Sequence, residues 1–333
     1  TIQRNIDTGV RTTLSIIRQC SGLAIRHQQG GPDLLDRIGT YYGSRRPITV
    51  ISRAAKMLSV QHRSALWALF LLYAFAPGAH ALFTPQSTAW EHWRPAADSR
   101  EIAVDHSPWG ELLERYLDDG HPSGVSRFDY AAVSDADARR LDGYIDGLAA
   151  VPIARLTPAQ QQAYWINLYN ALTVRLILES PDVSSIRQIR DGLFSIGPWN
   201  REVVSIAGTA LTLNDIEHRI LRPLYGDARV HFAVNCASIG CPDLQREPFI
   251  ADNLDALMNS ATRAYLAHPR GLSVDGDILR LSTIFKWFAE DFGDNREAVL
   301  VWLSQYAPTA SADVVKTWSG RISYDYDWAL NRP

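Results

Sequence analysis

Apolar residues recur along the chain with two different spacings, and the spacing predicts which kind of element each segment forms. An apolar residue at every third or fourth position buries one face of a helix, whereas alternation, or a short apolar run beside a turn, is typical of a strand. Helical spacing predicts helices over 109–117, 134–148, 158–178, 215–221, 252–267, 284–292 and 296–306. Strand patterns predict strands over 125–130, 230–235 and 322–328, and hairpins over 202–213 and 272–281. The mixture predicts an α+β fold, a single domain in which helices surround a small antiparallel or mixed sheet.

The helix over 158–178 has the most complete start signal. Thr157 is its predicted N-cap, Pro158 occupies the first helical position, and Gln160 completes a capping box. The segment is apolar almost all round, which predicts a central, buried helix. Asn167 and Asn170 lie three residues apart and share one face. Buried amides need hydrogen-bond partners, so these side chains either hold a loop in place, the more common role, or line a site.

A short polar helix is predicted after the first hairpin. Asn214 is its expected N-cap, and Pro223 is expected to end it. Glu217 and His218 are neighbours in this helix and point about 100° apart. They are therefore expected to serve different neighbours rather than each other.

A predicted strand leads directly into a loop that contains two cysteines. Val230, Phe232 and Val234 alternate with His231, Ala233 and Asn235, as in a half-buried strand. Cys236 falls where the alternation stops, and Ser238, Gly240 and Pro242 then break the chain. We call residues 236–242 the cysteine loop. A thiol on a turn at the end of a strand is in a position where a rigid scaffold presents a reactive group.

The first part of the chain is expected to lie outside the mature protein. A basic start at Met57, an apolar run over 65–77 and an Ala-x-Ala end at Ala81 predict a secretory signal peptide over 57–81, with an uncleaved anchor as the alternative. The run is shorter than the roughly 20 residues of a membrane span. Residues 1–56 then read as upstream translated sequence or a disordered extension, or alternatively as a basic arm. We expect a periplasmic or secreted protein with a lead-in over 82–104 and a domain over 105–333.

Charge and cysteine content narrow the function classes for the mature part. Residues 82–333 carry 23 Lys and Arg against 33 Asp and Glu, a formal net charge of −10, which argues against nucleic acid or an anionic membrane as partner. Cys20 belongs to the first segment and is left out of the site. Cys236 and Cys241 remain, and an even count in an exported protein first suggests a disulfide.

Five motifs in this part of the chain resemble the DUF547 family. They are the segments 165–172, 215–222, 231–242, 285–288 and 326–331, and they occur in the order found in that family. The resemblance covers about residues 105–333. It implies one domain of the family, whose bacterial members are often exported, and it implies no agreed function.

The first functional hypothesis is a cysteine hydrolase or acyltransferase that acts on a peptide-like or amide substrate. Cys236 is the candidate nucleophile, and the amides of 237–240 are candidate oxyanion donors. His218 and His231 are the candidate bases, and Glu217, Asn167 or Asn170 would orient the base. On an extended strand His231 would face away from Cys236, so His218 is the better candidate. Singly, each histidine is more often a hydrogen-bonded structural residue.

Three further hypotheses remain open. A Cys236–Cys241 disulfide would fix the loop of a non-catalytic binding or scaffold domain, although so short a loop gains little from closure. A redox-active pair is a variant of this, but the spacing is Cys-x4-Cys rather than the usual Cys-x-x-Cys. A metal site built from His218, His231, Cys236 and Cys241 would have an unusual spacing for zinc. The chain has no GxGxxG, P-loop or HExxH motif, so no cofactor is expected.

Overall fold

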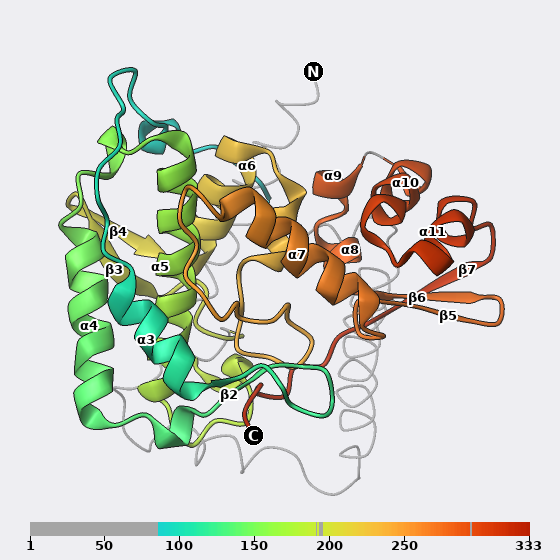
Figure 1. Cartoon of the computed structure of the whole chain (residues 1–333), viewed down its shortest axis with the longest axis horizontal. Helices are drawn as coiled ribbons and strands as arrows, with labels where there is room; N and C mark the ends of the chain where they lie inside the picture. The colour runs from blue at the N-terminus through green and yellow to red at the C-terminus, as the bar shows by residue number, and fades with distance from the viewer. Residues whose placement is uncertain (1–85, 191, 193–195, 294) are drawn as a thin grey trace, which may run out of the picture. The chain divides into compact units, whose positions relative to one another are not determined.

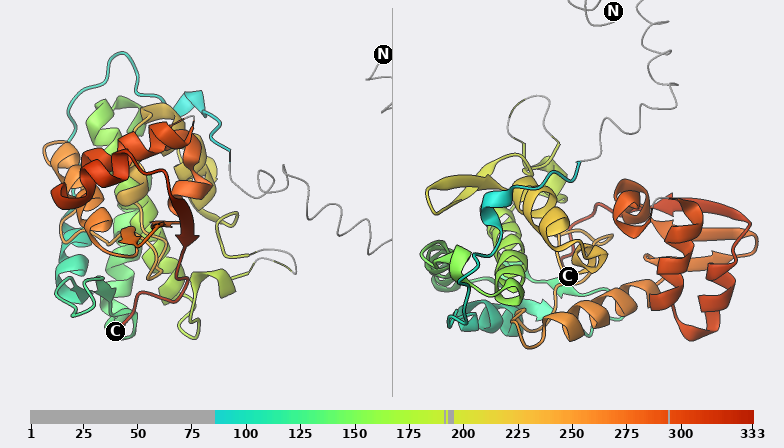
Figure 2. Two further views of the ribbon diagram at one scale, coloured as in Figure 1. Left: turned by 90° about the vertical axis from the view of Figure 1, so that its right-hand side faces the viewer. Right: turned by 90° about the horizontal axis from the view of Figure 1, so that it is seen from above.

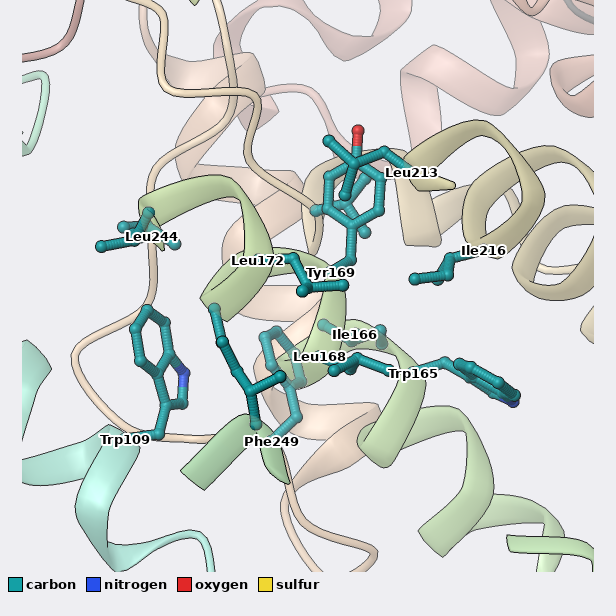
Figure 3. Packing of buried hydrophobic residues seen from close by; sticks show 14 of the residues in the cluster. Trp109, Trp165, Ile166, Leu168, Tyr169, Leu172, Leu213, Ile216, Leu244 and Phe249 are labelled. Atoms are coloured by element: carbon teal, nitrogen blue, oxygen red, sulfur yellow. The ribbon is translucent and has the colours of Figure 1, made fainter. Parts of the chain in front are cut away.

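Helix α5 (Pro158–Leu178) runs through the middle of the fold and is buried on nearly every side (Figure 1). The predicted capping box is present, because the Thr157 side chain accepts from the Gln160 N–H and the Gln160 side chain accepts from the Thr157 N–H. Sixteen of the 21 residues of α5 are buried. Figure 3 shows large side chains of α5, among them Trp165 and Tyr169, packed against side chains from several other segments. The prediction of a central, buried helix is confirmed.

The computed structural model describes residues 86–190, 192, 196–293 and 295–333, all within one compact unit, His80–Pro333. The predictions for residues 1–56 and for the signal peptide over 57–81 lie outside these residues. Within the described ranges, no helix combines the length and the hydropathy that a membrane crossing requires.

The apolar side chains form two clusters. The α5 cluster gathers around α5, with α3 (Ser107–Tyr116), α4 (Asp135–Ala149), the hairpin of β3 (Glu202–Ile206) and β4 (Thr209–Thr212), and η7 (Asp215–Leu221). The C-terminal cluster contains Phe232 together with side chains from the later helices and strands. These elements are α7 (Leu254–Ala267), β5 (Leu272–Asp275), β6 (Ile278–Ser282), α8 (Ile284–Trp287), α9 (Ala289–Phe292), α10 (Arg296–Tyr306), α11 (Thr309–Lys316) and β7 (Arg321–Asp325). Figure 2 shows α10, α11 and β5–β7 as a group beside the helices around α5.

The strands form three small sheets. β1 (Leu117–Asp118) pairs with β2 (Arg127–Phe128), and β3 (Glu202–Ile206) pairs with β4 (Thr209–Thr212), in both cases antiparallel. The third sheet has the order β5-β6-β7, in which β6 and β7 run parallel. Ala207 and Gly208 join β3 to β4 with φ values of 49° and 79°, as a two-residue hairpin of the right twist requires. The α+β class and both hairpins are confirmed.

The strand predicted over 230–235 is wrong. Ala228–Phe232 is a short 3-10 helix, η8, and the Asp227 side chain caps it by accepting from the Arg229 N–H. Burial does not alternate along this segment, because His231 and Asn235 are as buried as the apolar residues between them. Their polar atoms have partners inside the protein, so the alternation in the sequence does not mark a solvent-facing side.

The short helix after the first hairpin also differs from its prediction. It is the π-helix η7, and the Asn214 side chain does not cap it but donates to Asn200 Oδ1. Thr212 and Asp215 cap it instead, since Thr212 Oγ1 accepts from the Asp215 N–H and Asp215 Oδ2 accepts from the Thr212 N–H. The predicted bounds are confirmed, since η7 ends at Leu221, but the chain continues directly into α6 (Arg222–Tyr225), where Pro223 lies in the first turn and is tolerated.

Smaller differences occur near the C-terminus and in the lead-in. The helix predicted over 284–292 is two helices, α8 and α9, that are separated at Phe288. Helix α11 was not predicted, and β7 ends at Asp325 rather than at residue 328. In the lead-in, Trp93 is buried against Trp165 with 5.3 Å between ring centroids, so this segment contributes to the α5 cluster.

Candidate functional site

Cys236 and Cys241 lie in contact at the two ends of a tight turn. Their sulfur atoms are 2.6 Å apart, which is longer than the roughly 2.05 Å of a disulfide bond, and both cysteines are free. The Cys236 N–H also donates to Cys241 Sγ at 2.8 Å. Cys236 is partly exposed, whereas Cys241 is buried. The loop therefore brings a partly exposed cysteine and a buried cysteine into contact, and the predicted disulfide stays a prediction.

Two hydroxyl groups complete the surroundings of the Cys236 sulfur. Ser238 Oγ lies 3.2 Å from it, and Tyr326 Oη, from the segment after β7, lies 3.1 Å from it. Burial by itself raises the pKa of Cys236, but hydrogen bonds from Cys241, Ser238 and Tyr326 outweigh this and bring the pKa below its ordinary value. Burial and the neighbouring Cys236 raise the pKa of Cys241 well above its ordinary value. Cys236 is therefore the thiol that ionises first.

Asn170 of α5 fixes the start of the cysteine loop. Its side chain donates to the Ala233 carbonyl at 2.9 Å and accepts from the Asn235 N–H at 2.8 Å. The Asn235 side chain in turn donates to the Pro242 carbonyl and accepts from the Ala237 N–H, at 2.6 and 2.7 Å. Ala237 adopts a φ of 57°, a left-handed conformation that is strained for a residue other than glycine. Asn170 thus holds the loop, and Asn167 does the same for the backbone of Phe249.

The segment over 326–331 lies along the other side of the cysteine loop. The Ile239 N–H donates to the Ala329 carbonyl and the Gly240 N–H to the Asp327 carbonyl, both at 2.8 Å. The approach is so close that a Cβ on Gly240 would stand 2.8 Å from the Asp327 nitrogen. Three of the amides predicted as oxyanion donors, those of Ala237, Ile239 and Gly240, thus already have acceptors inside the protein.

The two candidate histidines lie in a separate buried group of charged residues, which we call the histidine cluster. It contains Glu217, His218, Arg222, His231 and Asp291. His231 Nε2 lies 2.6 Å from Asp291 Oδ2, and its Nδ1 lies 3.5 Å from Glu217 Oε1. Burial lowers the pKa of His231, but hydrogen bonds and charge interactions with Asp291 and Glu217 raise it overall. The ring also stacks on Phe288 with 4.3 Å between centroids. The two carboxylates therefore favour the protonated form of His231.

His218 has the opposite electrostatic character. Burial is the main cause that lowers its pKa to about 4, and Arg222, whose Nη1 lies 3.2 Å from His218 Nδ1, lowers it further. Burial raises the pKa of Glu217, but the neighbouring His218, His231 and Arg222 bring it down to about 2. At neutral pH the cluster therefore holds a neutral His218 beside an ionised Glu217.

The structure thus divides the five predicted catalytic residues between two places. Cys236 and Asn170 meet at the cysteine loop, whereas Glu217, His218 and His231 meet in the histidine cluster. Among the described residues, the hydrogen-bond neighbours of the Cys236 sulfur are Cys241, Ser238 and Tyr326, and neither histidine is one of them. In the same residues, no three His, Cys, Asp or Glu side chains are grouped as metal ligands.

Sequence reasoning missed Tyr326, Ser238 and Asp291. Tyr326 belongs to a motif that resembled the family, but nothing in its local sequence indicates a contact with Cys236. Asp291 lies on the polar side of a predicted helix, where an acidic residue is usually solvated, and here it pairs with Arg222 and His231. A buried Tyr169 links the two places. Burial is the main cause that raises the pKa of Tyr169 well above its ordinary value, and interactions with Glu217 and with the two cysteines raise the pKa further.

The comparison with known families agrees with the resemblance. Residues 153–266 match the family described as "Protein of unknown function, DUF547". This segment belongs to the DUF547 family. The DUF547 segment contains α5, η7, the cysteine loop and all but the last residue of α7, but not the motifs over 285–288 and 326–331, so the domain boundaries stay a prediction. No curated protein and no solved structure matches the chain.

Proposed function

We propose that Cys236 and Cys241 form a redox-active dithiol that exchanges with a disulfide in a peptide-like substrate. The asymmetry of the pair carries this proposal. The partly exposed Cys236 has a lowered pKa, whereas the buried Cys241, in contact with it, has a raised pKa. An accessible thiolate that attacks and a buried thiol that resolves is the division of labour that thiol–disulfide exchange requires.

The exchange takes two displacement steps. The Cys236 thiolate attacks one sulfur of the substrate disulfide, a mixed disulfide forms, and the other substrate sulfur leaves as a thiolate. Cys241 then gives its proton to that thiolate and attacks Cys236 Sγ, and the second substrate sulfur leaves as a thiolate that takes up a proton from solvent. The protein dithiol is oxidised to a disulfide, and the substrate disulfide is reduced to two thiols. With an oxidised protein and a dithiol substrate the same steps run in reverse.

The hydroxyl groups around Cys236 support this chemistry better than they support a hydrolase. A hydrolase needs a base that takes a proton from the nucleophile and returns it to a leaving group, whereas exchange needs only a stabilised thiolate. Tyr326 and Ser238 place hydroxyl groups 3.1 and 3.2 Å from the sulfur, and His231 is engaged with two carboxylates. The hydrolase or acyltransferase, and the scaffold with a fixed disulfide, stay as alternatives that the experiment below separates.

Export would place this dithiol where it has substrates. Disulfides form and persist outside the cytoplasm, and the signal peptide expected over 57–81 would deliver the protein there. The proposal therefore includes a periplasmic or secreted location. Thiol labelling of intact cells with a membrane-impermeant reagent tests that part separately.

The test traps the mixed disulfide. The reduced protein, residues 82–333, is incubated with bis(2-hydroxyethyl) disulfide, and its intact mass is read over time. We expect Cys241→Ser to accumulate one mixed disulfide at Cys236. The native protein should become about two daltons lighter as its disulfide closes. Cys236→Ser should form an adduct much more slowly than Cys241→Ser.

Two results would overturn the proposal. A native disulfide that resists mild reduction would favour the scaffold. Hydrolysis of amide or ester substrates by Cys241→Ser, without any disulfide exchange by the native protein, would favour the hydrolase.

A further inference from the structure

Four partly exposed aromatic rings form a continuous group beside the cysteine pair. We call this group, Trp199, Trp287, Tyr326 and Trp328, the aromatic platform. Tyr326 and Trp328 lie 4.6 Å apart between ring centroids, and Trp287 lies 4.9 Å from Tyr326 and 5.5 Å from Trp328. Trp199 extends the group at 5.6 Å from Trp328. The rings are in mutual contact, yet none of them is fully buried.

The aromatic platform spans the junction of the two apolar clusters. Trp199 and Trp328 pack against the α5 cluster, and Trp287 and Tyr326 pack against the C-terminal cluster. Tyr326 is also the residue whose hydroxyl lies 3.1 Å from the Cys236 sulfur. Tyr326 therefore connects the surroundings of the Cys236 sulfur with the other three rings.

The exposure of these rings has a physical consequence for what binds there. Trp and Tyr offer large, rigid apolar surfaces, and covering them removes water at little cost in conformational entropy. A small disulfide would cover little of such a surface. A polypeptide with aromatic or large apolar side chains beside its cysteine would cover much more of it, because those side chains reach Trp287 and Trp328, whose ring centroids lie 4.9 and 4.6 Å from that of Tyr326.

We infer that the aromatic platform selects polypeptides in which aromatic or large apolar side chains flank the disulfide cysteine. This inference rests on the proposed thiol exchange, and it names the substrate class of that same site. The attacked cysteine lies at Cys236, and the flanking side chains pack on Trp287 and Trp328.

The test measures binding without thiol chemistry. The probe is an acetylated, amidated pentapeptide, Gly-Phe-Ser-Phe-Gly, in which serine replaces the substrate cysteine, and the comparison peptide has alanine in place of both phenylalanines. Calorimetric titration of residues 82–333 gives the two dissociation constants. We expect the phenylalanine peptide to bind at least about tenfold more tightly than the alanine peptide.

Matched tryptophan variants locate the binding. Trp328 and Trp90 are both half-buried indoles with a guanidinium over the ring, that of Arg187 at 5.1 Å and that of Arg219 at 3.8 Å. Trp328→Leu should remove most of the preference for the phenylalanine peptide, whereas Trp90→Leu should keep it. Circular dichroism and melting curves verify that both variants are folded.

The outcomes separate this inference from the proposed function. Equal binding of the two peptides, or an equal loss of preference in both variants, would overturn the aromatic platform as a selective surface even if exchange is observed. Selective binding that depends on Trp328, in a protein that exchanges no disulfide, would support the platform and refute the proposed function.

Discussion

The Tyr326 hydroxyl lies 3.1 Å from the sulfur of Cys236, although the two residues are 90 positions apart in the sequence. Burial raises the pKa of Tyr326 well above its ordinary value, and the neighbouring cysteines raise it further, so the phenol keeps its proton. A protonated phenol at this distance donates to a thiolate and stabilises it. Tyr326 therefore stabilises the negative charge of the Cys236 thiolate and does not act as a base that takes its proton.

Removal of this hydroxyl should make Cys236 less reactive. In Tyr326→Phe the thiolate loses one charge-assisted hydrogen bond, so the pKa of Cys236 rises and labelling by iodoacetamide near pH 6 slows by about tenfold. The rate is read from intact mass over time. Tyr324→Phe, at a residue of β7 that is 40 % exposed, is the control and should label like the native protein. Equal rates in the two variants would show that the phenol does not act on the thiol.

Loss of Asn170 should destabilise the protein. Asn170→Ala leaves the Ala233 carbonyl and the Asn235 N–H buried without their partner, which should lower the free energy of unfolding by about 3 kcal/mol. Urea denaturation of residues 82–333 measures this. Asn259→Ala, on the surface of α7, removes an exposed amide and should cost less than about 0.5 kcal/mol. A small loss at Asn170 together with inactive thiols would instead indicate a direct chemical role.

The contribution of His231 to stability should decrease as the pH rises. Its folded pKa lies above the unfolded value near 6.5, so its stabilisation is fully present below about pH 6.5 and is lost as the pH rises through the raised pKa. His231→Gln should therefore be less stable than the native protein by about 3 kcal/mol at pH 5, and by less at pH 9.

The comparison with the native protein isolates the contribution of His231. His218, Glu217 and Asp291 also face His231, but their pKa values of about 4, 2 and 2 place their titration below pH 5. The control for the loss of an imidazole is His92→Gln, at an exposed histidine. A deficit of His231→Gln that grows with pH would contradict the raised pKa.

Two glycine substitutions should have opposite effects. Gly240→Ala places a methyl group within 3 Å of the Asp327 backbone, which forces the segment over 326–331 away and should cost about 1–3 kcal/mol. Gly143→Ala, inside α4 with open space around the new atom, should stabilise the protein by up to about 1 kcal/mol. Thermal unfolding measures both. Tyr326 moves with its segment, so Gly240→Ala should also slow labelling of Cys236.

The sequence predicts the elements whose signals are local. The Thr157–Gln160 capping box, the Ala207-Gly208 turn and the apolar periods of α3, α4 and α7 are each encoded within one short segment, and all are confirmed. The alternation over 230–235 is equally local, but it misleads, because His231 is polar in sequence and fully enclosed in the fold.

The candidate site depends on contacts that local sequence does not encode. Cys236 was predicted as the nucleophile from its place after an apolar run, and it remains the candidate for that role. Its partner Tyr326 is held near it by the hydrogen bond from the Gly240 N–H to the Asp327 carbonyl, and no spacing of residues in the sequence predicts this bond. His218 was the preferred base because its helix left it unrestricted. That helix is a π-helix, and His218 lies beside Arg222 within it.

The position of residues 326–331 beside the cysteine loop determines when, during synthesis, the surroundings of Cys236 become complete. Cys236 and Cys241 leave the ribosome about 90 residues before Tyr326, so the thiols exist in the nascent chain well before the group that stabilises the thiolate. Until then Cys236 lacks one of its donors and behaves more like an ordinary cysteine. The surroundings that stabilise the thiolate are therefore complete only after residues 326–331 have been synthesised and have packed beside the cysteine loop.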